Sequence, residues 1–513
     1  MRLSETSSPY RDNTGLPGAD SGPGIFTSPL STAPAFILLI SLTAFLTLLE
    51  ILSLPFASAL PISLMASAGW ALLGTGEPNK SSLSSVVALL VIYLSGAFYI
   101  SRSLDVGREF NESLGRARPP ARIASTGIVA EERAWGFGRV AIVDSPEGRC
   151  VLKFDAGRGD GRQNFSRGEV VTFSGTLAPF ERAKEGSSFD EYLYWRAKGA
   201  SAAIQRPSAE RVGVSWGVAR WRAFLESRIK QTLPPRTAGY LLAAFVGDRD
   251  PSLADLHRAV GTSHLLAVSG THVAIVYGIF WFFLRGLKFR LCIVSALVWL
   301  YVAMTGAAPS ALRAAFMIQL VIMGRIIGRS GKPFNTVAAA GAIMLLQNPW
   351  LFHDVGWRLS MLAALSVTAT PSGSAGARFF FASSFVWLAT ALQATWTFGG
   401  VPLAGLIANI FALPAFAVLF PLSFVLSLPS LLAMPLGWLV AAVPEFLFAR
   451  WERLSLNILT LCPWKTSFST PLLAFGVAAM AFFFARASGF DRGRAAIASG
   501  IMVFGILSVV FLV

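Results

Sequence analysis

Long apolar runs are the feature that most constrains the fold of this chain. Several stretches of about 20 residues contain no Asp, Glu, Lys or Arg, and this is the length that an α-helix needs to cross the apolar core of a bilayer. A mean hydropathy of +0.58 and a hydrophobic content of 54% exclude an ordinary soluble protein. The chain is therefore predicted to cross a membrane several times, and its clearest runs are 33–49, 83–100, 265–284 and 379–398.

Charge divides the chain into regions. About half of the Lys and Arg residues, and more than half of the Asp and Glu residues, lie between positions 102 and 235, which predicts a soluble domain between two membrane parts. The first residues are rich in Pro, Gly and Ser, as is typical of a disordered tail. We expect a disordered cytoplasmic tail over 1–32, three transmembrane helices over 33–101, a β domain over 102–215, an amphipathic interfacial helix over 216–235 and a membrane domain of seven to nine spans over 236–513.

The β domain is expected to be a small closed barrel. Alternating apolar and polar residues predict strands at 122–129, 139–143, 150–154, 169–177 and 200–205, and a helix is predicted at 189–198. Five short strands separated by turn-rich segments suit a barrel of the OB type. The predicted fold class is a polytopic α-helical membrane protein with an inserted extracytoplasmic small β-barrel (OB-like) domain.

The segment that follows the barrel has the pattern of a basic amphipathic helix. Trp216, Trp221 and Phe224 can share one side, while Arg220 and Arg228 lie elsewhere. Such a helix can lie in the membrane interface. It can equally pack on the barrel, and the sequence does not decide between the two.

The basic loops give an orientation. The loop after the run 265–284 contains Arg285, Lys288 and Arg290. The loop two spans further on contains Arg325 and its neighbours, whereas the hairpin between these two spans is uncharged. Because cytoplasmic loops collect Lys and Arg, both basic loops and the N terminus are expected in the cytoplasm and the barrel outside. A group of arginines just after position 101 opposes this orientation. The net charge of +15 is explained either by such loops or by a polyanionic partner.

The sequence offers little for metal or disulfide chemistry. Its three cysteines have no CxxC spacing, and its four histidines are dispersed. We therefore expect no metal site, no cofactor and no catalytic residue.

Polar groups inside apolar segments are the candidates for function, since such groups are costly at membrane depth and face a cavity or one another. The segment 264–273 places His264, Ser269, Thr271 and His272 in an otherwise apolar run, with a Ser-Gly step that suits a break in the helix. A structural pair of histidines at a kink is the alternative reading of this segment.

Further polar groups recur later in the membrane domain. Arg313 is expected about one turn inside a helix that begins near Pro309. Asp354 and Arg358 have the i, i+4 spacing of a helical ion pair, with either a structural or a functional role. Asn409 is a lone amide between two prolines.

These motifs resemble the membrane domain of the ComEC family of DNA-uptake proteins. The resemblance rests on the His-Leu-Leu-Ala-Val-Ser-Gly-x-His-Val signature at 264–273 and on Gly247-Asp248-Arg249. It also includes Thr305-Gly306 with Pro309 and Arg313, Asn348-Pro349 with Leu359-Ser360, and Ala408-Asn409. The segment 188–200 resembles the end of the family's OB-like domain, so the likeness covers most of 34–510.

The resemblance implies passage of single-stranded DNA through a bacterial inner-membrane channel during natural transformation. The chain lacks the metallo-β-lactamase-like domain of many family members and any GxxxxGK[ST] motif, so the expected partners are a separate nuclease, a cytoplasmic motor and a periplasmic or surface DNA receptor, besides the lipid bilayer. The expected DNA path comprises His264, Ser269, Thr271, His272, Arg313, Arg358 and Asn409, the expected structural ion pairs use Asp248, Arg249 and Asp354, and the expected outer-domain DNA contacts are Trp135, Phe137, Arg139 and Lys153.

Three other functions remain open from the sequence. A permease for a small anion would show internal repeats, and none is visible. A membrane-embedded hydrolase would use Ser269 and His272, whose spacing of three residues suits a nucleophile and its base poorly. The third is a non-transporting scaffold.

Overall fold

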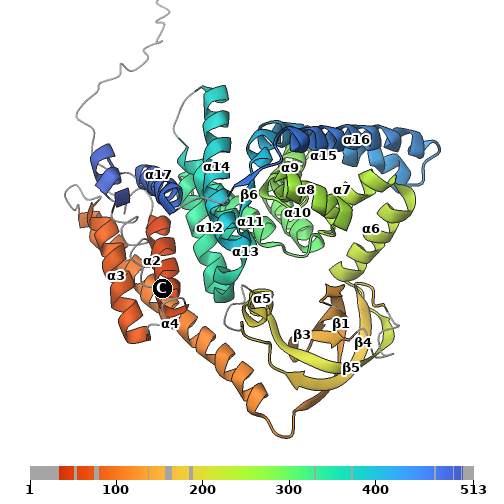
Figure 1. The fold of residues 1–513 in the computed structure, drawn as a ribbon, viewed down its shortest axis with the longest axis horizontal. Helices are drawn as coiled ribbons and strands as arrows, with labels where there is room; N and C mark the ends of the chain where they lie inside the picture. The colour runs from red at the N-terminus through yellow and green to blue at the C-terminus, as the bar shows by residue number, and fades with distance from the viewer. Residues whose placement is uncertain are drawn as a thin grey trace, which may run out of the picture.

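The computed structural model describes residues 34–50, 55–73, 80–136, 138–155, 164–183, 189–328, 331–370, 374–466, 470–488, 490–497 and 499–500. Membrane helices form the upper part of the molecule, and a β-barrel lies beneath them (Figure 1). The predicted fold class, a polytopic helical protein with a small barrel domain, is confirmed. The expected tail over 1–32 lies outside the described residues.

The N-terminal part consists of three helices, α2 (Pro34–Glu50), α3 (Phe56–Leu73) and α4 (Lys80–Arg116). The third is longer than the apolar run that predicted it. Its helix continues past position 101 because helix-compatible residues follow, with an Arg116–Glu112 pair at i, i+4, and the first helix breaker is Pro119. An ion pair between Arg108 and Glu50 ties the extension of α4 to α2.

The barrel closes in the strand order β1-β2-β3-β5-β4, a five-stranded Greek-key arrangement of the OB kind. All five predicted strands are present and each is longer than predicted, β1 and β5 by the most. The first half of β1 pairs with β4 and its second half pairs with β2, with a bulge between Val129 and Glu131. The bulge bends the strand, so it continues through polar residues that break the alternation. The strands are β1 (Arg122–Trp135), β2 (Gly138–Ser145), β3 (Gly148–Phe154), β4 (Glu169–Ala178) and β5 (Ala200–Val214).

The barrel docks on the membrane helices through α5 (Glu191–Ala197), which packs against the short helix η3 (Pro349–His353). Asn348 joins the two parts, because its Nδ2 donates to the Ala197 carbonyl at 3.1 Å while its Oδ1 accepts from the Trp350 amide at 3.1 Å. The Arg196 guanidinium lies 5.2 Å from the centre of the Trp350 ring. This seam fixes one side of the barrel.

A second connection runs through α6 (Val218–Thr232), the predicted amphipathic helix. Its Ile229 is buried against α7 (Pro235–Phe245), whereas Trp216 and Trp221 are 94% and 60% exposed. Arg167 of the barrel pairs with Glu226 at 2.8 Å, and Lys230 links Glu226 to Asp248. The helix therefore contacts both the barrel and the membrane domain while its aromatic face stays exposed.

Five helices in the described residues are long and apolar enough to cross a membrane. One is in α4, and four belong to the membrane domain, where four shorter apolar helices accompany them. The α15 helix bends at three internal prolines yet continues as one element. The membrane domain comprises α7, α8 (Pro251–Val260), η2 (Ser263–Leu265), α9 (Gly270–Phe283), α10 (Arg290–Met304), α11 (Pro309–Ile327), α12 (Pro333–Gln347), η3, α13 (Val355–Ala369), α14 (Ala375–Phe398), α15 (Ala404–Leu431), α16 (Gly437–Leu461) and α17 (Thr470–Ser488), with a two-stranded ribbon of β6 (Val401–Pro402) and β7 (Lys465–Thr466).

Replacing Trp195 by alanine tests the docking of the barrel. This side chain of α5 is fully buried in a core cluster that joins barrel residues to η3, and its Nε1 donates to Glu191 at 3.0 Å. Removing it should destabilise the protein by about 3–5 kcal/mol, seen as a lower midpoint of thermal unfolding in detergent. Trp216→Ala is the matched control, since that residue is 94% exposed. Its free energy of unfolding should stay within about 0.5 kcal/mol of the parent, so its midpoint should hardly move. Equal midpoints for the two variants would contradict the packing described above.

Candidate functional site

The membrane domain contains a break in α-helical structure between α8 and α9, which holds only the short 3-10 helix η2. The α8 helix ends at Gly261 in the left-handed conformation, with φ of 81°, and α9 begins only at Gly270. Gly261 has a second reason to be glycine, because a Cβ there would lie 3.0 Å from the Gly405 Cα of α15. Irregular backbone at membrane depth needs protein or water partners. One partner is the Ser310 hydroxyl of α11, which donates to the Val268 carbonyl.

Ser269 and His272 start α9. The Ser269 amide donates to His272 Nδ1 at 3.0 Å, and the Ser269 hydroxyl lies 3.2 Å from the same nitrogen. The imidazole therefore takes the part that Glu or Gln plays in a capping box. Its ring packs edge-on against Phe420 with the centroids 4.4 Å apart. No carboxylate is among the hydrogen-bond partners of His272 in the described residues, so the third member of a hydrolytic triad is lacking there.

His264 and Thr271 flank the break and differ from His272 in burial. Both are exposed, whereas His272 is 6% exposed and packed. The break thus has a buried side, where its backbone is satisfied, and an open side that presents an imidazole and a hydroxyl. A third histidine, His257, is a packed core residue held by Tyr240 at 2.9 Å and Thr262 at 2.8 Å.

Arg313 lies beside the break. It is 8% exposed, its Nη1 donates to the Ser360 carbonyl at 2.7 Å, and a Cβ placed on Gly270 would meet its Nη2 at 3.1 Å. Within the described part of the chain, no carboxylate lies within 4 Å of this guanidinium. A guanidinium buried without a counter-ion is costly in a membrane protein and marks a polar path or an anion site.

The predicted helical pair of Asp354 and Arg358 does not form. Asp354 has extended backbone, with φ of −76° and ψ of 115°, and stands before α13 as its N-cap, accepting from the Trp357 amide at 2.7 Å. The i, i+4 geometry requires both residues to be helical, which is why the spacing misled. The Nε of Arg358 is buried and has no hydrogen-bond partner among the described residues.

Asn409 lies on the α15 face that meets the break. It follows Gly405 by four residues, so both lie on one side of the helix, and Gly405 contacts Gly261. The Asn409 side chain is half-buried and its Oδ1 has no partner among the described residues. A free amide oxygen at this position can accept from a ligand or from water.

The Gly247-Asp248-Arg249 turn connects α7 to α8. Gly247 has φ of 77°, and a Cβ there would lie 2.9 Å from the Thr305 carbonyl oxygen. Asp248 pairs with Lys230 at 3.6 Å, as expected of a structural residue. Arg249 is exposed and has no ion pair in the described residues, so it does not share that role.

The basic residues expected to contact DNA on the barrel are already paired. Arg139 is bound by Glu132 and by Asn164 at 2.7 Å, and Lys153 is bound by Glu191 at 2.7 Å. Trp135 is half-buried in an aromatic cluster with Phe189, Tyr194 and Trp195. Phe137 lies outside the described residues.

Two cations that the sequence did not single out lie where the barrel faces the membrane domain. Arg133 stands 4.9 Å from the Trp195 ring centre, and Lys198 stands 5.1 Å from the Tyr194 ring centre. Burial and the charge of Arg133 lower the pKa of Lys198, and Asp354 of the membrane domain partly opposes this. Arg133 precedes Trp135 by two positions, so the strand periodicity could have placed both on one face.

Comparison with known proteins agrees with this architecture. The fold defines a polytopic membrane protein with a docked five-stranded barrel and a break between α8 and α9. Residues 241–490 match the family model described as Competence protein, and this range includes all the polar groups around the break. The resemblance to the ComEC family is thus confirmed over the membrane domain, which is similar to that of competence proteins.

The chain is similar to ComE operon protein 3 of Bacillus subtilis (strain 168), to which it is 31% identical over 219 residues. The aligned part covers 40% of this chain and 28% of that relative, so the chain spans well under half of the relative's length. No solved structure matches the chain.

Gly247→Ala should destabilise the membrane domain. An alanine in the left-handed region costs about 1–3 kcal/mol, and here its methyl group would also press on the Thr305 carbonyl. Gly278→Ala is the matched control, because nothing lies within 4 Å of a Cβ at that position. The thermal midpoint in detergent should fall for the first variant and stay level or rise for the second. A level midpoint for both variants is the contrary result.

Acid should weaken the connection between α6 and the barrel. Burial alone would raise the pKa of Glu226, but the hydrogen bond from Lys230 and the charge of Arg167 outweigh it and hold the pKa below 4.5. A carboxyl whose pKa is lower in the folded state stabilises it above the unfolded pKa, and this stability is lost as the pH falls through the folded pKa.

Glu226→Gln should therefore lower the unfolding midpoint at pH 7, and the difference from the parent should shrink as the pH falls below about 4. Glu112→Gln removes an exposed i, i+4 pair with Arg116 and should shift the midpoint little at any pH. A difference between Glu226→Gln and the parent that does not depend on pH would show that the carboxylate charge has no part in the connection.

Proposed function

We propose that this chain forms the inner-membrane channel through which single-stranded DNA reaches the cytoplasm during natural transformation. The observation that carries the proposal is the buried Arg313 guanidinium, which lies without a carboxylate partner beside a helix break in a competence-type membrane domain. A phosphate backbone in a region of low dielectric constant needs cationic and hydrogen-bonding groups along its path. Arg313, together with the exposed His264 and Thr271 and the free Asn409 oxygen, supplies such groups.

The barrel is proposed to receive the strand outside the membrane. Arg133 and Lys198 are cations beside aromatic rings, which is the combination that binds phosphates and stacks bases in proteins that bind single-stranded nucleic acid. Arg139 and Lys153 take a smaller part, since carboxylates already neutralise them. The Trp135 cluster contributes rings at the same end of the barrel.

The orientation and partners belong to the same proposal. Basic loops at Arg285 to Arg290 and at Arg325 support an orientation with the N terminus in the cytoplasm and the barrel outside. Single-stranded DNA, a DNA receptor, a separate nuclease and a cytoplasmic motor would act with the chain. The hydrolase alternative loses support, because capping of α9 accounts for the Ser269–His272 pair.

The first experiment is deletion of the gene in its host, followed by addition of homologous marked DNA and counting of both transformants and externally bound DNA. We expect transformants to vanish while bound DNA persists, because the block is at the inner membrane. Normal transformation in a competent host that has no second copy would overturn the channel assignment.

Complementation of this deletion then tests Arg313. Arg313→Gln should lower transformation by at least about tenfold at equal protein level, because the path loses its buried cation, and Arg313→Lys should retain part of the activity. Arg258→Gln is the matched control, since that arginine is 74% exposed at its side chain and pairs with Asp255 on the surface of α8. Full activity of Arg313→Gln would remove this residue from the path.

A further inference from the structure

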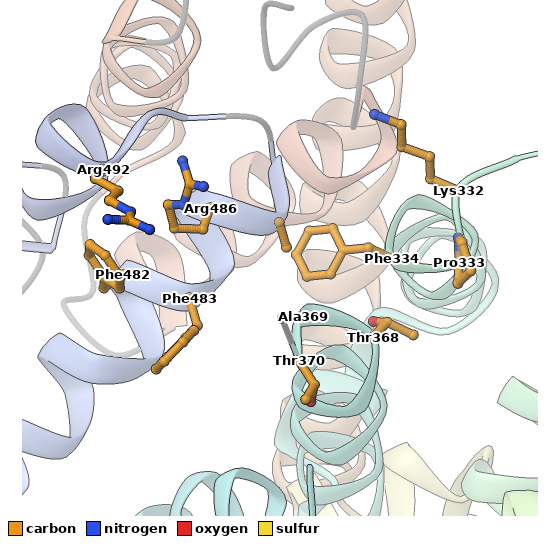
Figure 2. Close-up of a pocket in the computed structure, with 11 residues that line it drawn as sticks. Lys332, Pro333, Phe334, Thr368, Ala369, Thr370, Phe482, Phe483, Arg486 and Arg492 are labelled. Atoms are coloured by element: carbon orange, nitrogen blue, oxygen red, sulfur yellow. The ribbon is translucent and has the colours of Figure 1, made fainter. Parts of the chain in front are cut away.

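A cavity of about 610 Å³ lies away from the break, where the N-terminal end of α12 meets the C-terminal ends of α13 and α17. Figure 2 shows Arg486 and Arg492 on the α17 side, Lys332 on the α12 side, and the Phe334 ring between them. None of these residues belongs to the DNA path proposed above. The cavity therefore needs its own explanation.

The cavity gathers positive charge from three segments. Lys332 precedes α12, Arg486 lies in the last turn of α17, and Arg492 follows that helix. In the described residues none of the three pairs with a carboxylate, while nearby Asp491 pairs with Arg494 at 3.3 Å. Arg486 gives one nitrogen to the Phe490 carbonyl at 2.6 Å and keeps further N–H donors. Converging cations without a counter-ion favour an anionic ligand.

The inner wall of the cavity is apolar. Phe334 is 5% exposed and packs against Phe36 and Phe484, with ring centroids 4.6 and 6.0 Å away, while Phe482 and Phe483 line the α17 side. The hydroxyl of Thr368 donates to its own helix backbone, so it adds no donor for an anion. The ligand that fits has a negative head beside an apolar part.

The position of the cavity relative to the two faces of the membrane agrees with such a ligand. Lys332 belongs to the same basic connection as Arg325, which the charge rule assigns to the cytoplasmic face. Cationic pockets between transmembrane helices on that face bind the head groups of anionic lipids. We propose that this cavity holds the phosphate head group of an anionic glycerophospholipid of the cytoplasmic leaflet, with its chains along Phe482 and Phe483.

The test uses the purified full-length chain in detergent, with lipid binding followed by native mass spectrometry. Lys332→Gln/Arg492→Gln removes two exposed cations that make no ion pair in the described residues, so the fold should be unaffected. Phosphatidylglycerol should bind the parent more tightly than phosphatidylcholine does. The double variant should bind phosphatidylglycerol about 30-fold more weakly, which corresponds to about 1 kcal/mol for each charge.

Arg285→Gln/Lys288→Gln is the matched control, because it removes the same charge from another exposed basic loop, and its affinity should stay within about twofold of the parent. An equal loss of affinity for phosphatidylglycerol in both double variants would show that only the net charge of the protein matters, and this would overturn the proposed site. Equal binding of the two lipids by the parent would overturn it too. Selective binding of inorganic phosphate, with no preference between the lipids, would assign the cavity to a free anion instead.

A single variant, Phe482→Ala, tests the apolar wall separately. Binding of phosphatidylglycerol should weaken, whereas any binding of inorganic phosphate should not change, because only the lipid has chains to lose contact. Unchanged lipid affinity in this variant would contradict the placement of the chains.

Discussion

A backbone that leaves the helical path inside a membrane must find hydrogen-bond partners within the protein, and this constraint organises the whole membrane domain. Between Gly261 and Gly270 the chain is not α-helical, and two other helices, α11 and α15, pack against it. Ser310 of α11 donates to the Val268 carbonyl, Gly405 of α15 comes into backbone contact, and the His272 ring caps the helix that follows. Arg313 lies on the same helix as Ser310 and is held against the break. The helix that satisfies the Val268 carbonyl therefore also positions the buried guanidinium.

Local patterns predicted much of the fold because the elements concerned are decided locally. Apolar runs located the long helices, and alternation located all five strands of the barrel. The ends were less predictable. The α4 helix continues to Arg116 because hydropathy ends at the membrane boundary whereas helix propensity does not, and β1 continues to Trp135 because a bulge lets one strand pair with two neighbours.

The candidate site was predictable in membership but not in roles. The segments carrying His264, Arg313 and Asn409 are far apart in the chain, and their meeting at the break depends on helix packing that no local pattern encodes. The role of each polar residue depends on which side chains and backbone groups it contacts in the fold. Asp354 caps a helix rather than pairing with Arg358, since its own backbone is extended and it stands just before the first helical residue. Lys153 looked free in the sequence because Glu191, its partner, lies on a different element.

The barrel distributes its charge unequally, and this bears on how a polyanion would meet it. Two sets of its cations differ in their partners. Arg139, Lys153 and Arg167 are held by carboxylates and contribute to folding and docking, whereas Arg133 and Lys198 face the membrane domain beside aromatic rings.

Docking at two places, through Asn348 on one side and Glu226 on the other, keeps that face directed at the membrane helices. On the proposed function, the strand would therefore be drawn toward the membrane by Arg133 and Lys198, two cations on this face that form no ion pair in the described residues.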